Sequence, residues 1–159
     1  MARAPKPGKK FKYDLTAVLK VREIREKKEQ EKFAEKNREY LTEKQREEAI
    51  AAEKRGKEEE LRGVFRQGPI ANFHKVLQRR AHLDVLKDDL AEQVDKVIEA
   101  SKRLEEQRAK LVEAVKDKKI MEKHKEKKLD EYNKLMSGLE MKFMDEIATQ
   151  RFKRGKEPS

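Results

Sequence analysis

Three serines and three histidines are the side chains in this sequence most able to carry out catalysis. They are Ser101, Ser137 and Ser159, together with His74, His82 and His124. His74 and His82 lie eight residues apart, whereas two metal-binding histidines on one helix face are typically four apart. The six glycines form no phosphate-binding loop, and the absence of cysteine excludes thiolate metal sites and a cysteine nucleophile. The sequence therefore predicts no enzyme, no metal site, no cofactor and no small-molecule substrate.

Basic residues around an aromatic ring form a second chemical pattern, at both ends of the chain. Phe11 lies in GKKFKYD and Phe152 in RFKRGK, and such segments can bind single-stranded nucleic acid through charge and stacking. A solvated tail has the same composition. The net charge of +10 is also local: residues 1–12 carry +5, residues 116–128 carry +4 and residues 151–159 carry +3. Local basic segments favour contacts with an acidic partner over a general nucleic-acid coat, so nucleic acid is the less favoured partner.

The composition is typical of long helices. Of 159 residues, 47% are charged and only 35% are hydrophobic, and tryptophan is absent. Alanine, glutamate, lysine, leucine and arginine supply 93 residues, more than half of the chain. This composition excludes an all-β fold and a compact globule with a large apolar core. No run of 18 apolar residues exists to span a membrane, so the cytoplasm is the expected compartment.

Glycine and proline divide the chain into two predicted helices. The first is expected at about residues 14–62, with Asp14 as its N-cap. Gly63 and Pro69 bound a predicted turn at residues 63–69, and the second helix is expected at residues 70–149. We therefore expect a basic flexible tail at residues 1–12, a single coiled-coil domain at residues 13–150 and a basic tail at residues 151–159.

Apolar residues recur at heptad spacing in both predicted helices. Steps of three and four from Phe73 to Phe143 meet 14 apolar residues in 21 positions, and a frame from Leu15 to Val64 meets 7 in 15. The sequence thus predicts an all-α fold in which two long helices form an antiparallel coiled-coil hairpin with a longer second helix. A turn near residue 66 would place Leu15 opposite Asp117. The apolar stripe at residues 129–147 would then lie beyond the first helix, available to dock a partner, to fold back or to pair in a homodimer.

Two segments of the sequence resemble one known family. The opening FKYDLTAVLKVREIREKKEQEKFAE, residues 11–35, has an aromatic–basic–aromatic triplet followed by spaced leucine, valine, arginine and glutamate residues. These positions are Phe11, Lys12, Tyr13, Leu15, Val18, Leu19, Arg22 and Glu26. Residues 118–152 also look like the end of that family, with a basic helix followed by Asp-Glu-Ile-Ala and a basic terminus. The chain resembles the flagellar export protein FliJ family.

The resemblance implies an architecture and a set of partners. Proteins of this family are antiparallel coiled coils, similar to the rotor shaft of rotary ATP synthases, and sit in the hexameric flagellar export ATPase. They also contact the export gate and escort export chaperones. The expected function is that of a non-enzymatic central stalk and chaperone escort in the flagellar type III export apparatus. It would be cytoplasmic and peripherally associated with the cytoplasmic face of the inner membrane at the flagellar base. A basic coiled-coil nucleic-acid-binding protein and a structural homodimeric spacer are the alternatives.

The same resemblance suggests candidate contact residues. The hairpin end that carries both termini would enter the ATPase ring, where its basic residues would suit an acidic lumen. The candidates for contact with the ATPase are Lys9, Lys10, Phe11, Lys12, Tyr13, Arg22, Arg151, Lys153 and Arg154. The candidates for contact with the export gate or another partner are Phe73, Leu77, Tyr132, Met136, Leu139 and Phe143.

Overall fold

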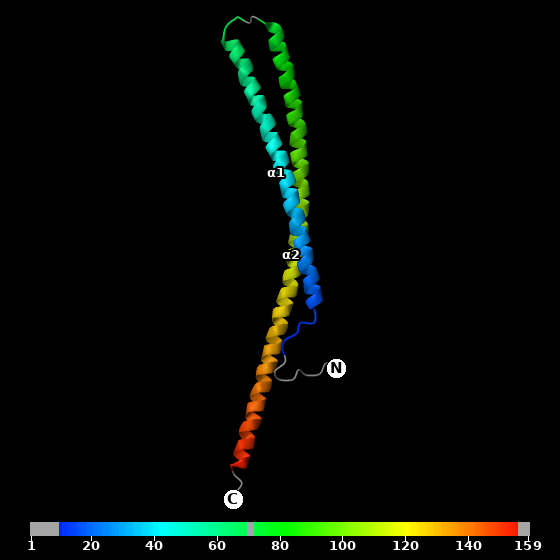
Figure 1. Cartoon of the computed structure of the whole chain (residues 1–159), viewed down its shortest axis with the longest axis vertical. Helices are drawn as coiled ribbons and strands as arrows, with labels where there is room; N and C mark the ends of the chain where they lie inside the picture. The colour runs from blue at the N-terminus through cyan, green and yellow to red at the C-terminus, as the bar shows by residue number, and fades with distance from the viewer. Residues whose placement is uncertain (1–9, 70–71, 156–159) are drawn as a thin grey trace. The chain divides into compact units, whose positions relative to one another are not determined.

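Two long helices make up nearly all of the structure (Figure 1). The computed structural model describes residues 10–69 and 72–155, and within these ranges there is no β-strand. Helix α1 spans Thr16–Arg66 (51 residues) and helix α2 spans Phe73–Arg154 (82 residues). The predicted all-α fold with a longer second helix is confirmed. The chain divides into two units, and we describe each by itself: unit 1 combines residues 1–25 with 114–159, and unit 2 is residues 26–113.

In unit 2 the two helices pack antiparallel on either side of a short turn. The turn starts later than expected, because α1 continues through Gly63 to Arg66. Gly68, not Gly63, adopts the left-handed conformation, with φ of 104°. That conformation strains residues with a Cβ, which explains a glycine at this position. After the turn, the side-chain oxygen of Asn72 accepts a hydrogen bond from the Lys75 amide at 3.3 Å and caps α2, which begins at Phe73.

The start of α1 also differs from the expectation. The helix begins at Thr16, two residues after the predicted cap Asp14. The Leu15 carbonyl accepts the bond from the Leu19 amide at 3.0 Å, so Leu15 occupies the position before the helix. The Thr16 hydroxyl donates to the Tyr13 carbonyl at 2.5 Å. A local side-chain bond therefore turns the chain into the helix, in place of a carboxylate cap.

Buried glutamines hold the two helices of unit 2 together. Gln93 Nε2 donates to the backbone oxygen of Glu43 at 2.9 Å and to its carboxylate at 2.6 Å. Gln107 makes the same pair of bonds to Glu29, at 3.3 and 2.5 Å. The two glutamines are only 5% and 7% exposed. The residue numbers of each pair sum to 136, whereas those of the predicted facing pair, Leu15 and Asp117, sum to 132. The difference arises because α1 runs past Gly63 before the chain reverses.

The predicted heptad frame is right for α1 and partly wrong for α2. The α1 positions chosen between Arg22 and Val64 are all half-buried, as expected of a seam. In α2, however, one of the two seam positions falls a residue earlier than predicted, so that Val94 is 37% exposed. The side chains buried at this position are Leu86, Gln93, Ala100, Gln107, Ala114 and Met121. The error arose because aliphatic residues were favoured, whereas four of these six positions hold alanine or glutamine.

Acid should weaken unit 2 through Glu29. The hydrogen bond from Gln107 is the main cause that lowers the pKa of Glu29 below its ordinary value of 4.5; Lys32 adds to it and burial opposes it. Because the folded-state pKa is the lower one, the stabilisation is complete above pH 4.5 and is lost as the pH falls through the folded-state value. We expect Gln107→Ala to reduce this loss. Melting temperatures measured from neutral pH to below pH 4.5 for both proteins check it, and parallel curves would contradict it.

Unit 1 has a small apolar core of its own. Tyr13, Leu19 and Met121 are each 6–7% exposed and form one cluster, against which Phe11 packs. Ala114, only 1% exposed, continues the seam of α2 into this unit. Because the reversal comes later than predicted, Asp117 lies against Arg22 rather than Leu15.

Candidate functional site

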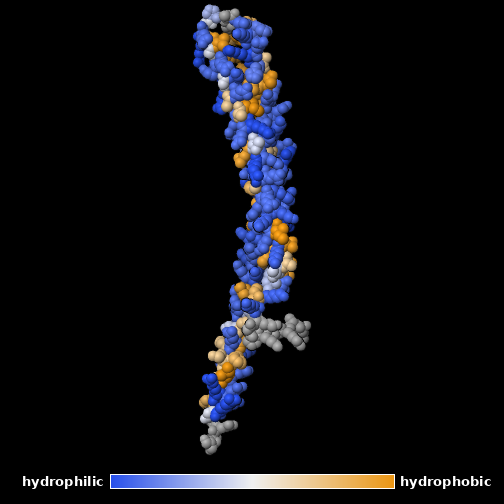
Figure 2. Space-filling model, viewed as in Figure 1, coloured by the Kyte–Doolittle hydropathy of each residue, from blue (hydrophilic) through white to orange (hydrophobic). Residues whose placement is uncertain are grey.

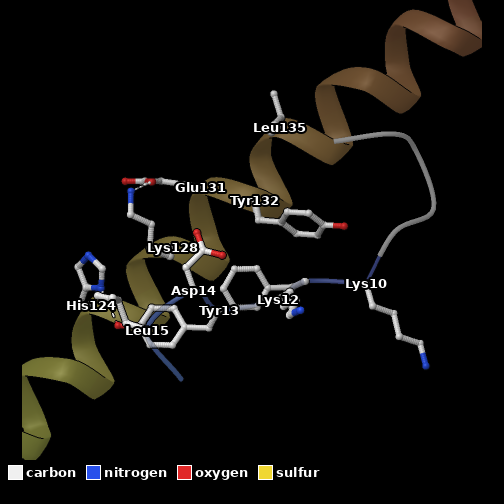
Figure 3. A pocket seen from close by; sticks show the side chains of 11 residues that line it. Lys10, Lys12, Tyr13, Asp14, Leu15, His124, Lys128, Glu131, Tyr132 and Leu135 are labelled. Atoms are coloured by element: carbon white, nitrogen blue, oxygen red, sulfur yellow. Dashed lines mark hydrogen bonds and ion pairs between the residues drawn. The ribbon is translucent and has the colours of Figure 1, made fainter. Parts of the chain in front are cut away.

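The most distinctive surface of unit 1 is a groove between the extended N-terminal residues and α2 (Figure 3). We call it the aromatic groove. It has a volume of 670 Å³, within the range of ligand pockets. Its lining comes from residues 10–15 and from His124, Lys128, Glu131, Tyr132 and Leu135 of α2. Residues 10–12, which were expected to belong to a flexible tail, therefore help to form the aromatic groove.

Ring contacts attach the N-terminal residues to α2. The Tyr13 hydroxyl and His124 Nδ1 share a hydrogen bond of 2.7 Å, drawn as a dashed line in Figure 3. Their ring centroids lie 5.7 Å apart. Further along α2, the rings of Phe11 and Tyr132 lie 5.5 Å apart and tilted by 55°, a favourable aromatic arrangement. These two contacts, eight residues apart on α2, preform the floor of the groove.

The rim of the aromatic groove is charged. Lys128 Nζ donates to the Glu131 carboxylate at 2.8 Å, which raises the pKa of Lys128 and lowers the pKa of Glu131. In Figure 3 the Lys10 side chain extends away from the helix. Lys10, Lys12 and Asp14 are all exposed. The rim charges outside the Lys128–Glu131 ion pair are therefore two positive and one negative.

Charge is divided unequally between the units. Unit 1 contains 21 lysines and arginines against 11 acidic residues, a net charge of +10. Unit 2 contains 21 of each and is neutral. Most of the visible surface is hydrophilic, with hydrophobic residues in separate patches (Figure 2). Any attraction of an acidic partner by net charge must therefore come from unit 1.

Eight of the nine ATPase-contact candidates lie among the described residues, all in unit 1, whereas Lys9 lies outside them. Lys10 and Lys12 are exposed, and Arg151, Lys153 and Arg154 are exposed in the last turn of α2. These five residues have side chains that a partner can reach.

The other three ATPase-contact candidates are engaged within unit 1. Tyr13 is only 7% exposed and Phe11 is half-buried, so the Tyr13 ring has little surface left for a partner. Arg22 Nη1 donates to the Asp117 carbonyl at 2.8 Å and links the two helices.

The candidates for contact with the gate or another partner fall into both units. Phe73 and Leu77, 64% and 50% exposed, occupy the first turns of α2 in unit 2. Phe143 is 60% exposed in unit 1, whereas Tyr132, Met136 and Leu139 are half-buried there. Tyr132 is in contact with Phe11, so the structure joins residues that the sequence had assigned to two different partners.

Sequence reasoning missed four groove residues on α2: His124, Lys128, Glu131 and Leu135. His124 has a structural role, because its ring shares the hydrogen bond with the Tyr13 hydroxyl. The missed signal was the spacing of eight residues between His124 and Tyr132. This spacing returns to the same broad face of a helix, where the two rings can contact Tyr13 and Phe11 of an extended segment.

The described residues lack two further chemical features. No group of three or more histidine, aspartate or glutamate side chains in residues 10–69 and 72–155 is arranged to hold a metal ion. Over these same residues, neither helix has a stretch apolar enough to cross a membrane.

Comparison with known proteins identifies the family. A family model described as "Flagellar FliJ protein" matches residues 11–157, nearly the whole chain. A solved structure of a putative YscO homolog from Chlamydia trachomatis has the same fold, with a TM-score of 0.55 and 22% sequence identity. The match covers 93% of this chain and all of the other. A search of curated proteins found no significant match. The two-helix fold and the extent of the family match lead to one conclusion: the chain belongs to the FliJ family of flagellar protein-export components.

Proposed function

We propose that this protein is a non-enzymatic central stalk and chaperone escort of the flagellar type III export apparatus. It binds the hexameric export ATPase and the cytoplasmic domain of the export gate, and it hands over export chaperones. It works in the cytoplasm, peripherally associated with the inner membrane at the flagellar base. The observation that carries this proposal is the family match over residues 11–157 of a chain whose described part is a two-helix coiled coil.

The division of charge supports the choice of unit 1 for the ATPase. A net charge of +10 in unit 1, against none in unit 2, would attract and orient an acidic ring lumen. The neutral unit 2 instead presents exposed apolar side chains near the turn, Phe73 and Leu77 among them, which suit a contact with the gate. Polar surface covers most of both helices, as expected of a shaft.

Charge reversal in unit 1 should weaken binding to the ATPase. We expect Lys10→Glu combined with Lys12→Glu to reduce affinity about 10-fold or more, because like charges would then oppose an acidic surface. The measurement is binding to the purified export ATPase, together with stimulation of its ATP hydrolysis. The matched control is Lys87→Glu combined with Lys96→Glu, both exposed in unit 2, which should bind normally. A wild-type protein that does not bind the ATPase, and normal swimming of a deletion strain, would refute the proposed function.

Removal of two apolar side chains in unit 2 should weaken binding to the gate. We expect Phe73→Ala combined with Leu77→Ala to lower affinity for the gate cytoplasmic domain about 10-fold or more, because exposed aromatic and aliphatic side chains commonly anchor interfaces. ATPase binding should be unchanged. The control is Val85→Ala with Ile98→Ala, which are 55% and 48% exposed on the same helix. Equal weakening by both double variants would show that Phe73 and Leu77 are not the anchor.

A further inference from the structure

We propose that the aromatic groove of unit 1 is a peptide-binding site for an acidic segment that carries one aromatic or large aliphatic side chain. The proposal deepens the proposed function, since it relies on that function only for the source of the segment, an acidic export component. The chemistry of recognition is argued from the groove alone.

The groove has a preformed floor with apolar surface still open. The Tyr13–His124 hydrogen bond and the Phe11–Tyr132 ring contact fix the floor before any partner arrives. Leu135 of α2, on the wall, stays 47% exposed. Rigid aromatic and aliphatic walls of this kind receive an apolar anchor at low conformational cost. A volume of 670 Å³ suits one large side chain with a short stretch of its backbone.

The charge at the rim selects the flanking residues of the ligand. Lys10 and Lys12 border the groove, whereas Lys128 is already engaged by Glu131. Asp14 is the opposing charge on the N-terminal side, and the unit around it has a net charge of +10. Carboxylates on both sides of the anchor would therefore be attracted, and a basic segment would be repelled.

Single-stranded nucleic acid fits the same surface less well. Binding of bases requires open ring faces in succession. Tyr13 is buried, and the Phe11 and Tyr132 rings are tilted against each other, so the three rings do not form a row of free faces. The open surface is instead aliphatic, at Leu135, which favours a peptide side chain.

The test uses synthetic peptides and the full-length protein. An acidic peptide with one central phenylalanine should bind and shift the NMR signals of Tyr13, His124 and Tyr132. The same peptide with alanine in place of phenylalanine should bind at least about 10-fold more weakly. A lysine-rich version should not bind. Leu135→Asp should abolish binding, whereas Met141→Asp, at a 63% exposed site of the same unit outside the groove, should not.

Three outcomes would overturn the proposal. The first is that the acidic phenylalanine peptide does not bind. The second is that an oligothymidylate produces the same shifts more strongly, which would assign the groove to nucleic acid. The third is a dimer in light scattering that Leu135→Asp dissolves, which would show a second copy in the groove. If the wild-type protein binds the acidic peptide but does not bind the export ATPase, the proposed function is refuted and the peptide-binding site stands.

Discussion

Leu19→Asp is expected to separate the helices of unit 1 and to leave unit 2 folded. Leu19 is 6% exposed and packs with Tyr13 and Met121. The substitution removes a buried aliphatic side chain and places a carboxylate among apolar groups, at a cost of about 3–5 kcal/mol. Among the described residues the cluster has three buried members, so few apolar contacts remain to offset this cost.

Hydrogen exchange is the measurement that separates a local from a global effect of Leu19→Asp. Amide protection should fall in residues 16–25 and 114–125 and persist in residues 26–113, which pack through their own contacts. The control is Val21→Asp, at a 64% exposed position on the same helix, which should leave protection unchanged. Equal loss of protection in the two variants would contradict the assigned packing of Leu19.

Gln93→Leu is expected to destabilise unit 2, whereas Gln93→Leu combined with Glu43→Leu should stabilise it. The single change removes two hydrogen bonds to Glu43, whose side chain is 22% exposed, and costs about 1–3 kcal/mol. The double change replaces a polar pair by two packed aliphatic side chains, which is often neutral or favourable. The melting temperature should therefore fall and then rise above that of the wild type.

The melting temperatures of the Gln93 variants are compared with that of a control substitution at an exposed glutamine. Gln78→Leu, on the exposed face of the same helix, should have little effect. A double variant that melts below the single variant would show that Glu43 stabilises the seam independently of Gln93. A cycle on Gln107 and Glu29 should show the same signs.

Local chemistry made the two helices predictable, but their exact ends depend on packing. The heptad frame of α1 was right because its few apolar residues, such as Phe33 and Ile50, leave one consistent frame. The α2 frame was wrong at Val94, because the aliphatic Val94 was assigned to the seam in place of the adjacent Gln93. An amide becomes a seam residue only when a glutamate from another helix receives it, and one helix read alone carries no such information. The single coiled-coil domain at residues 13–150 stays a prediction.

The candidate site was predictable in its charge but not in its assembly. The basic segments were evident from composition, and all three belong to unit 1. The aromatic groove was not evident, because it requires Phe11 and Tyr13 to run along α2 as an extended segment. That path depends on contacts between residues more than a hundred positions apart, such as Tyr13 with His124. The roles of the individual contact candidates stay predictions.

The concentration of charge in unit 1 gives ionic strength two opposite effects there. With a net charge of +10 the residues of this unit repel one another, so counterions that screen the charge should favour its packing. The same screening would weaken its attraction for an acidic partner. Unit 2, with equal numbers of both charges, should respond little. Low ionic strength would thus weaken the packing of unit 1 while raising its affinity for an acidic partner. High ionic strength would do the reverse.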